Sequence, residues 1–328
     1  MNGACFVAGC GSIGRRHIRN LRTLGADPVY AFDSSSERLH GAVQDLGVGP
    51  CRSFEDGLSR RPALVLICTP PHQHVEMALN AVEAGSHVFV EKPLSDSLDG
   101  TDKLLAATAK AGRSLHVGYN WRFHPGLRRI YELLSRGDIG DLLTLRAEFG
   151  QYLPDWRPDQ DYRTSYTALA YMGGGIVRDA SHEVDYVCWL AGEVRGVYCL
   201  AGKFSNLEMD VEDTAEITLR LSSPAVAQIH VDCTQRAYTR NCKLIGTAGT
   251  LVWDYADGIR KYDSADKTWR HEPVLYDANF MYLAELGHVL ACVRGEQEVE
   301  VTGETGKRVL RIVLAALESA RTRREVAL

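Results

Sequence analysis

The first 120 residues alternate short apolar runs with amphipathic stretches. The apolar runs fall at 4–9, 28–33, 63–70, 87–93 and 114–120, and their positions do not alternate with polar ones. This pattern is typical of strands in a parallel sheet that is covered by helices on both faces. We therefore expect residues 1–121 to form an α/β domain with a Rossmann-type, doubly wound parallel sheet.

The pattern changes beyond residue 121. Candidate strands become longer and alternate apolar with polar positions, at 142–152, 194–205, 213–222, 225–235, 241–255 and 258–264. Helical periodicity marks 125–135, 182–191, 277–294 and 306–324. Such alternation favours an antiparallel sheet with one packed face and one wetter face. Residues 122–328 are thus predicted to form an α+β domain with a large, mostly antiparallel open sheet.

Composition and charge narrow the class of protein. With 45% apolar and 24% charged residues, the chain has the usage of a folded globular protein. The net charge of -5 gives no positive field for nucleic acid or anionic lipid, so neither is expected as a partner. No apolar run approaches the ~18 to 20 residues of a membrane span. The nine cysteines include no CxxC pair, which favours a reducing cytoplasm and no metal site.

A glycine-rich motif, Gly9-Cys10-Gly11-Ser12-Ile13-Gly14, follows the first predicted strand and opens a helix. Its glycines permit a tight turn, a close approach to a pyrophosphate, and packing of the helix on the strand. Asp33 ends the second strand, where its carboxylate can accept from the ribose hydroxyls of NAD. Ser34, Ser35, Ser36 and Arg38 could instead hold the 2'-phosphate of NADP, and Asp33 could simply cap a helix. NAD is favoured, with NADP possible.

Two further segments follow strand ends and are therefore expected to border the cofactor. They are Thr69-Pro70-Pro71-His72-Gln73-His74 and Glu91-Lys92-Pro93. A lysine that ends a buried strand beside a dinucleotide can transfer a proton or hold a substrate oxygen. The alternative for Lys92 is an ordinary surface lysine.

The second domain contains a segment dense in reactive groups, from Gly173-Gly174-Gly175 to His182 and Asp185. Three glycines allow the backbone to pass close to a ligand. A histidine with carboxylates in reach can move a proton near neutral pH. The alternative is a core histidine whose neighbouring carboxylates cap or pair.

Together these motifs, with VGYNWRFHP near residue 120, resemble the glucose-fructose oxidoreductase, inositol dehydrogenase and MocA family. The resemblance implies a Rossmann domain followed by an α/β domain whose open sheet often mediates oligomerisation, here a homodimer or homotetramer. It also implies that Lys92 is the active-site lysine and His182 the catalytic histidine. Family members commonly have an aspartate four residues before the histidine, where this chain has Arg178. Either Asp179 or Asp185 is then expected to support His182.

The predicted cofactor-binding residues are Gly9, Gly11, Ser12, Ile13, Gly14, Asp33, Arg38, Thr69, Pro70, His72, His74, Glu91, Lys92 and Asn120. The predicted substrate-binding residues carry aromatic rings or guanidinium groups, which suit a sugar ring and an anion. They are Arg122, Tyr152, Trp156, Arg157, Tyr162 and Arg163. They indicate an acidic or nucleotide-linked sugar, although the arginines could instead pair with Asp155, Asp159 and Asp161.

The resemblance implies an NAD(P)-dependent dehydrogenase or reductase acting on a CH-OH group of a sugar, sugar acid, sugar nucleotide or cyclitol. In this mechanism His182 withdraws the hydroxyl proton while Lys92 hydrogen-bonds the same oxygen. One alternative is a dinucleotide-binding sensor or scaffold without turnover. Another is a sugar-sugar oxidoreductase that retains its cofactor.

Overall fold

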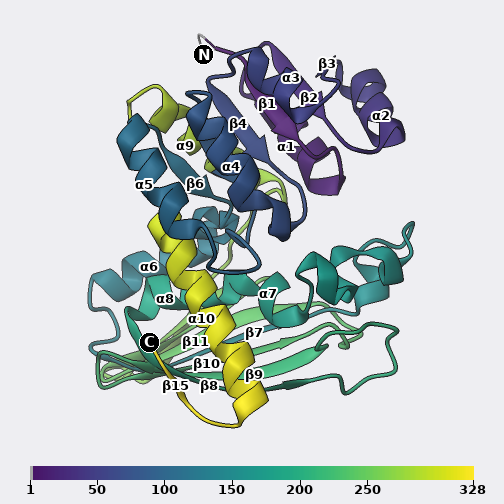
Figure 1. Cartoon of the computed structure of the whole chain (residues 1–328). Helices are drawn as coiled ribbons and strands as arrows, with labels where there is room; N and C mark the ends of the chain where they lie inside the picture. The colour runs from purple at the N-terminus through teal and green to yellow at the C-terminus, as the bar shows by residue number, and fades with distance from the viewer. Residues whose placement is uncertain (1–2) are drawn as a thin grey trace. The chain divides into compact units, whose positions relative to one another are not determined.

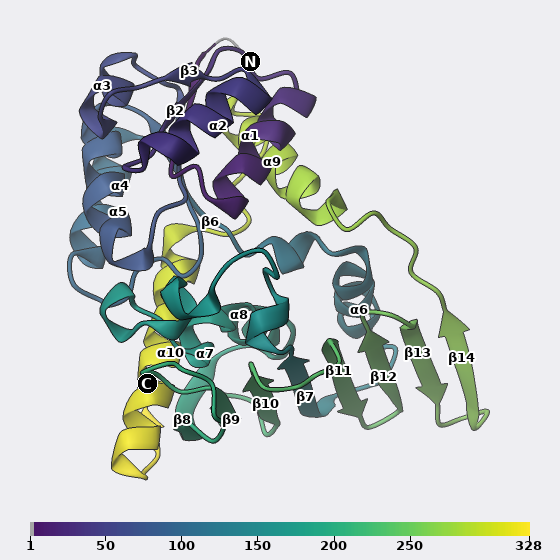
Figure 2. The same ribbon diagram turned by 90° about the vertical axis from the view of Figure 1, so that its right-hand side faces the viewer.

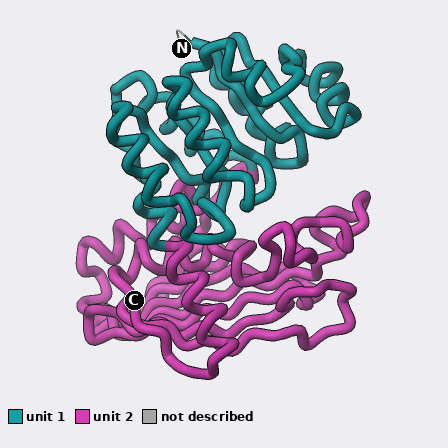
Figure 3. The backbone as a smooth tube through the Cα atoms, viewed as in Figure 1, with its two compact units in different colours: residues 1–120, 279–308 teal, residues 121–278, 309–328 magenta. Residues whose placement is uncertain are grey.

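The computed structural model describes residues 3–328, which form two compact units (Figure 3). Unit 1 runs up to Asn120 and also takes in Asn279–Arg308, whereas unit 2 comprises Trp121–Ala278 and Val309–Leu328. The chain first changes unit between Asn120 and Trp121, one residue before the expected boundary. The predicted second domain of 122–328 differs from the structure, because residues 279–308 return to unit 1.

Unit 1 contains a six-stranded parallel sheet in the order β3-β2-β1-β4-β5-β6 (Figure 1). Its strands are β1 (Cys5–Ala8), β2 (Val29–Phe32), β3 (Gly49–Pro50), β4 (Leu64–Ile67), β5 (His87–Val90) and β6 (Leu115–Val117). Every residue of β1 and β4 is buried, which explains their continuous apolar sequence. The strand order reverses between β1 and β4, the point at which open α/β sheets bind ligands at the carboxyl ends. The predicted doubly wound parallel sheet is confirmed.

Helices cover both faces of this sheet (Figure 1). They are α1 (Ser12–Thr23), α2 (Ser36–Leu46), α3 (Phe54–Ser59), α4 (His74–Glu83), α5 (Thr101–Ala111) and α9 (Phe280–Val293). Successive residues of β1 point to opposite faces: Cys5 and Val7 join the core with Ile18 of α1, while the Phe6 ring packs 5.6 Å from that of Phe54 in α3. The side chains of β1 therefore point alternately to two faces, both of which are buried.

The return of residues 279–308 to unit 1 has a clear cause in packing. Leu286, Val289 and Leu290 of α9 belong to the same buried core as Ile18 and Leu21 of α1. The amphipathic pattern of 277–294 correctly indicated a helix, yet the pattern shows only that one face is apolar, not which surface covers it.

Unit 2 is built on a nine-stranded sheet in the order β14-β13-β12-β11-β7-β10-β9-β8-β15 (Figure 2). Its strands are β7 (Leu142–Gly150), β8 (Val194–Gly202), β9 (Thr214–Leu221), β10 (Val226–Asp232), β11 (Thr239–Gly246), β12 (Gly249–Asp254), β13 (Gly258–Asp263), β14 (Thr268–Glu272) and β15 (Val326–Ala327). Only the β7–β10 pair is parallel among the described pairings of this sheet. The predicted mostly antiparallel sheet is confirmed, with β14 as a strand that the sequence pattern did not reveal.

Helices cover one face of the nine-stranded sheet (Figure 2). These are α6 (Pro125–Ser135), α7 (Ile176–Asp179) and α8 (Ser181–Ala191), while α10 (Gly303–Thr322) begins in unit 1 and continues into unit 2. On β8, Tyr198 and Leu200 keep 50% and 60% of their surface exposed, whereas Val197 and Cys199 are buried. The alternation in the sequence thus corresponds to a sheet with one buried face and one exposed face. No helix within residues 3–328 is long and apolar enough to cross a bilayer.

Candidate functional site

The glycine-rich turn joins β1 to α1 in unit 1, and two of its glycines are required by packing. Gly9 has a φ of +98°, and a Cβ on it would lie 2.6 Å from the carbonyl oxygen of Cys68. A Cβ on Gly14 would lie only 1.8 Å from the carbonyl oxygen of Gly9. A Cβ on Gly11 would meet no heavy atom within 4 Å in the described part of the chain. The turn is therefore closed behind Gly9 and Gly14 and open at Gly11.

The amino end of α1 suits a phosphate group. No side chain of the described residues caps this helix, and its first turn, which includes Ser12 and Ile13, holds no acidic residue. The first amide groups of a helix lack intrahelical acceptors and carry partial positive charge. With open space at Gly11, these amides would hold the pyrophosphate of NAD.

Asp33 follows β2 and is tied directly to the glycine-rich turn. Its Oδ2 accepts from the amide of Cys10 at 2.7 Å, and its Oδ1 accepts from the amide of Ser35 at 2.8 Å. Arg38 places its Nε 3.2 Å from the same Oδ1, while the Ser35 hydroxyl caps α2 by accepting from the Arg38 amide. Asp33 thus lies beside the glycine-rich turn, and the residue that caps α2 is Ser35, not Asp33. The Arg38 charge partly offsets that of Asp33.

The segment after β4 separates into exposed and buried residues. His72 is exposed, whereas His74 is fully buried. The His74 ring lies between two carbonyl oxygens, with Nε2 2.8 Å from that of Thr69 and Nδ1 2.9 Å from that of Pro93. Burial lowers the pKa of His74, although both carbonyls favour its protonated form. His74 was predicted to bind the cofactor, but its side chain contacts the backbone of Thr69 and Pro93 instead.

Glu91 and Lys92 follow β5, and Glu91 is engaged by a histidine that sequence reasoning missed. His17 of α1 is fully buried and places Nε2 2.6 Å from Glu91 Oε1. Glu91 Oε2 accepts from the amide of Lys92 at 3.2 Å. The available signal was the position of His17 three residues after Gly14, one turn along α1. Asn120, the last residue of unit 1 before the chain changes unit, is also buried.

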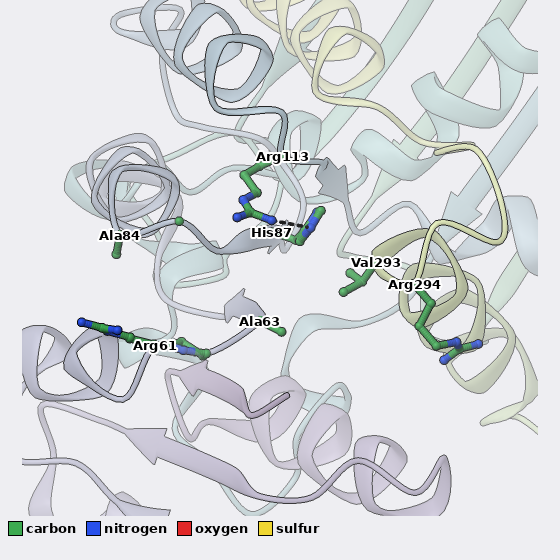
Figure 4. Close-up of a pocket in the computed structure, with 9 residues that line it drawn as sticks. Arg61, Ala63, Ala84, His87, Arg113, Val293 and Arg294 are labelled. Atoms are coloured by element: carbon green, nitrogen blue, oxygen red, sulfur yellow. Dashed lines mark hydrogen bonds between the residues drawn. The ribbon is translucent and has the colours of Figure 1, made fainter. Parts of the chain in front are cut away.

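A pocket of about 770 Å³ lies at the opposite edge of the same sheet, where the strands begin (Figure 4). Arg61, Arg113, Arg294 and His87 line it, and helices α3, α4, α5 and α9 all end nearby. Helix carboxyl ends carry partial negative charge, which arginines offset. Arg294 is also bonded to Glu296 through two contacts of 2.7 Å. The pocket lies at the end of the strands opposite to the glycine-rich turn.

In unit 2 the three-glycine segment packs against its own chain. Gly173 and Gly175 have φ values of +79° and +107°. A Cβ on Gly174 would lie 2.2 Å from the carbonyl oxygen of Tyr166, and one on Gly175 would lie 2.2 Å from Glu212 Oε1. We expected these glycines to let the backbone approach a ligand. The close approach at Gly174 and Gly175 is instead to neighbouring protein atoms.

Asp179 and His182 lie on either side of the short break between α7 and α8. Asp179 is buried and accepts from the Tyr166 hydroxyl at 2.5 Å and from the Thr167 hydroxyl at 2.7 Å. His182 is the second residue of α8 and is partly exposed, whereas the next three residues of the helix are buried. The first turn of α8 therefore presents His182 at the surface of unit 2.

Two arginines pair with the carboxylates that follow His182. Arg122 donates through Nε to Asp185 Oδ2 at 2.8 Å and through Nη2 to Asp185 Oδ1 at 2.6 Å. Arg240 places its Nε 2.8 Å from Glu183 Oε1, with all four side chains at most 8% exposed. Asp185 was predicted to be catalytic and Arg122 to bind substrate. The structure shows instead that they form a buried ion pair, because the planar fork of arginine matches a carboxylate.

The remaining substrate candidates divide into two sets. Arg157, Trp156 and Tyr162 line one small pocket of unit 2. Arg163 is exposed and donates to both oxygens of Asp161, which is the alternative that the sequence left open. Tyr152 lies apart from that pocket's lining, with the guanidinium of Arg236 3.6 Å from its ring centre.

Comparison with known proteins accounts for both units. A family profile described as the oxidoreductase family with an NAD-binding Rossmann fold matches residues 4–119, and the GFO/IDH/MocA C-terminal domain matches residues 127–252. Myo-inositol 2-dehydrogenase of Thermotoga maritima is 30% identical over 98% of this chain and 97% of its own length. The chain belongs to the GFO/IDH/MocA family. An uncharacterized oxidoreductase of Bacillus subtilis, YrbE, is also 30% identical, over 95% of this chain and 93% of its own.

Solved structures of the GFO/IDH/MocA family share this fold. Levoglucosan dehydrogenase in complex with NADH and L-sorbose has a TM-score of 0.90 at 20% identity, over 99% of this chain and 98% of its own. The WlbA dehydrogenase from Bordetella pertussis, in complex with NADH and UDP-GlcNAcA, has a TM-score of 0.85 at 25% identity, over 100% and 99%. The GFO/IDH/MocA protein described here is an NAD-dependent oxidoreductase of the dehydrogenase and reductase class.

Proposed function

We propose that this oxidoreductase transfers hydride between NAD and a hydroxyl or keto carbon of a sugar-like substrate, with Lys92 and His182 as the catalytic residues. The observation that carries the proposal is the arrangement in unit 1. The open glycine turn after β1, the uncapped amino end of α1 and Asp33 suit NAD. Lys92 follows β5, which is separated from β1 by one strand, β4, in the same sheet. The myo-inositol 2-dehydrogenase relative, similar along its whole length, supports the class of substrate.

NAD, when bound, supplies the hydride acceptor or donor. The Lys92 ammonium would donate a hydrogen bond to the substrate oxygen and stabilise the negative charge that develops there. His182 would take the hydroxyl proton during oxidation and return it during reduction. Its partly exposed place on the first turn of α8 suits this exchange.

Asp179 is the carboxylate that we assign to the support of His182. Asp185 is committed to two bonds from Arg122 in a buried pair, so its charge is already matched. Asp179 accepts from the Tyr166 and Thr167 hydroxyl groups, which fix the orientation of its carboxylate three residues before His182. A carboxylate held in this way can favour the protonated form of a nearby imidazole.

For the substrate we propose an acidic or nucleotide-linked sugar. Arg157 lies with Trp156 and Tyr162 around a hollow too small to enclose a sugar ring, so the substrate would rest against a fork for an anion and rings for stacking. The WlbA relative was crystallised with such a compound, UDP-GlcNAcA. Arg122 and Arg163 are left out of this proposal, because Asp185 and Asp161 engage their guanidinium groups.

The test is the change in reduced-nicotinamide absorbance with a panel of cyclitols, free sugars, sugar acids and nucleotide-linked sugars. NAD binding is measured separately by fluorescence titration. We expect turnover with at least one compound and its loss in Lys92→Ala and His182→Ala, while both variants still bind NAD. NAD binding without turnover across the panel would favour the sensor or scaffold. Turnover that survives in Lys92→Ala would remove Lys92 from the reaction.

We also propose that the protein is a cytoplasmic homodimer or homotetramer. The uncovered face of the nine-stranded sheet carries exposed apolar residues on β8, Tyr198 and Leu200, which would become buried in such an assembly. Light scattering after size exclusion should give the mass of two or four chains, and Leu200→Glu should lower it. A monomer of the parent protein would contradict this assignment.

A further inference from the structure

We propose that His17 and His74 are positioning residues, which hold the backbone on the two sides of Lys92. The inference rests on the proposed function, since it takes Lys92 as the group that contacts the substrate. Both histidines are fully buried in unit 1, and each bonds to a neighbour of Lys92 in the chain. His74 was expected to bind the cofactor, but its ring contacts the backbone of Thr69 and Pro93 instead.

His17 acts on the residue before Lys92. Its Nε2 lies 2.6 Å from Glu91 Oε1, and the other carboxylate oxygen accepts from the amide of Lys92. The His17 ring is set edge-on to Phe89 and Tyr282, with ring centres 5.1 Å and 6.4 Å away. Packed rings on these sides keep the imidazole directed at Glu91, and Glu91 in turn fixes the amide of Lys92.

His74 acts on the residue after Lys92. Its Nδ1 lies 2.9 Å from the carbonyl oxygen of Pro93, and its Nε2 lies 2.8 Å from the carbonyl oxygen of Thr69. Carbonyl oxygens only accept, so the nitrogen that carries the proton is the one that donates. The ring therefore lies between the segment after β4 and the segment after β5, both of which border the cofactor site. A neutral imidazole donates to one of the two carbonyls, and an apolar side chain would leave that carbonyl without its donor.

The two contacts link Lys92 to the elements that bind NAD. His17 belongs to α1, the helix whose amino end would hold the pyrophosphate, and His74 begins α4, directly after the Thr69 segment. A displacement of Lys92 relative to the cofactor would break at least one of these buried bonds. Because hydride and proton transfer need reacting atoms at near-contact distances, a shift of about 1 Å can reduce the rate by about a hundredfold.

The test compares His17→Leu and His74→Leu with His17→Gln and His74→Gln, in which an amide can still donate. His116→Leu is the matched control, since His116 is 2% exposed in β6 of the same unit and bonds to Ser114 at 2.9 Å. We expect kcat to fall at least tenfold in both leucine variants with the Kd of NAD within threefold. The glutamine variants should recover most of the loss, and the control should keep kcat within threefold.

A second readout does not depend on turnover. Amide hydrogen exchange at Lys92 should be at least tenfold faster in His17→Leu than in the parent protein and unchanged in His116→Leu. If Lys92→Ala is inactive while both leucine variants keep their kcat and exchange rates, the positioning role is wrong and the proposed function stands. If Lys92→Ala keeps full activity, the proposed function fails instead. An equal loss of kcat in His116→Leu would mean that the loss reflects general destabilisation and not the position of Lys92. Where a leucine variant does not fold, the kcat and the Lys92 amide exchange of the glutamine variant decide whether the positioning role holds.

Discussion

Replacing Arg122 with Met would leave Asp185 as a buried charge without its partner. The pair has two charge-assisted bonds of 2.8 Å and 2.6 Å, and the two side chains are only 6% and 1% exposed. Removing one member of a buried pair typically costs about 3–5 kcal/mol, because the remaining charge keeps its desolvation penalty. At about 2–4 °C for each kcal/mol, the expected loss in Tm is roughly 6–20 °C.

The double variant Arg122→Met/Asp185→Leu separates structure from chemistry. Apolar side chains of similar volume often replace a buried ion pair at little cost, so the double variant should be more stable than either single variant. Thermal unfolding followed by tryptophan fluorescence suits the assay, since the Arg122 guanidinium lies 5.7 Å from the Trp189 ring centre. Asp185→Leu alone should lose stability by a similar amount.

Turnover of the double variant then tests the assignment of Asp185. If Asp185 is structural, as the pairing indicates, the folded double variant should retain NAD-dependent turnover within about tenfold of the parent protein. If the double variant loses as much stability as the two single variants together, the two side chains are not coupled and the reasoning is refuted. Recovered stability with turnover no higher than in His182→Ala would return Asp185 to the catalytic group.

Three further predictions concern the nucleotide site and acid stability. Gly14→Ala should lower both the Tm and the affinity for NAD, because its Cβ would lie 1.8 Å from the carbonyl oxygen of Gly9. Gly11→Ala should keep its Tm, and titration should show that only its affinity for NAD is lowered. Asp33→Asn should weaken NAD binding by about tenfold to 150-fold and narrow its preference over NADP, measured by competition, if its charge recognises the ribose. Burial lowers the pKa of His116 and of His124 to about 3. Below about pH 6.5 the unfolded chain therefore binds more protons than the folded protein, and the free energy of unfolding decreases as the pH is lowered. Between pH 7 and pH 5 each histidine should lower the free energy of unfolding by about 2 kcal/mol. In His116→Phe or His124→Phe, urea unfolding at a series of pH values should show a decrease that is smaller by that amount. The same pH dependence as in the parent protein would contradict the burial argument.

The nucleotide-binding region was accessible from the sequence because its determinants are local. The glycines of the first turn lie within six consecutive residues, and Asp33 ends the next strand of the same βαβ unit. Their spacing follows from the geometry of one turn and one crossover. The bond from the Cys10 amide to Asp33 shows that this short-range pattern also reports a real contact.

The partners of the buried charges could not be predicted in the same way. Asp185 lies 63 residues from Arg122, and His17 lies 74 residues from Glu91. Periodicity shows that a residue faces the interior, but the identity of the residue across the interface depends on the packing of separate elements. For that reason Asp185 and Arg122 were each assigned a separate function, when their proximity indicates a shared structural one.

The discontinuity of unit 1 affects how the protein emerges from the ribosome. The first 120 residues contain every strand of the parallel sheet, yet Leu286 and Val289, which cover Ile18 and Leu21, are synthesised more than 250 residues later. Until then that apolar surface of α1 stays uncovered, a condition that favours chaperone binding or aggregation. A truncation after residue 120 would therefore make a poor isolated nucleotide-binding fragment, and an expression clone of this unit needs the segment up to residue 308 attached.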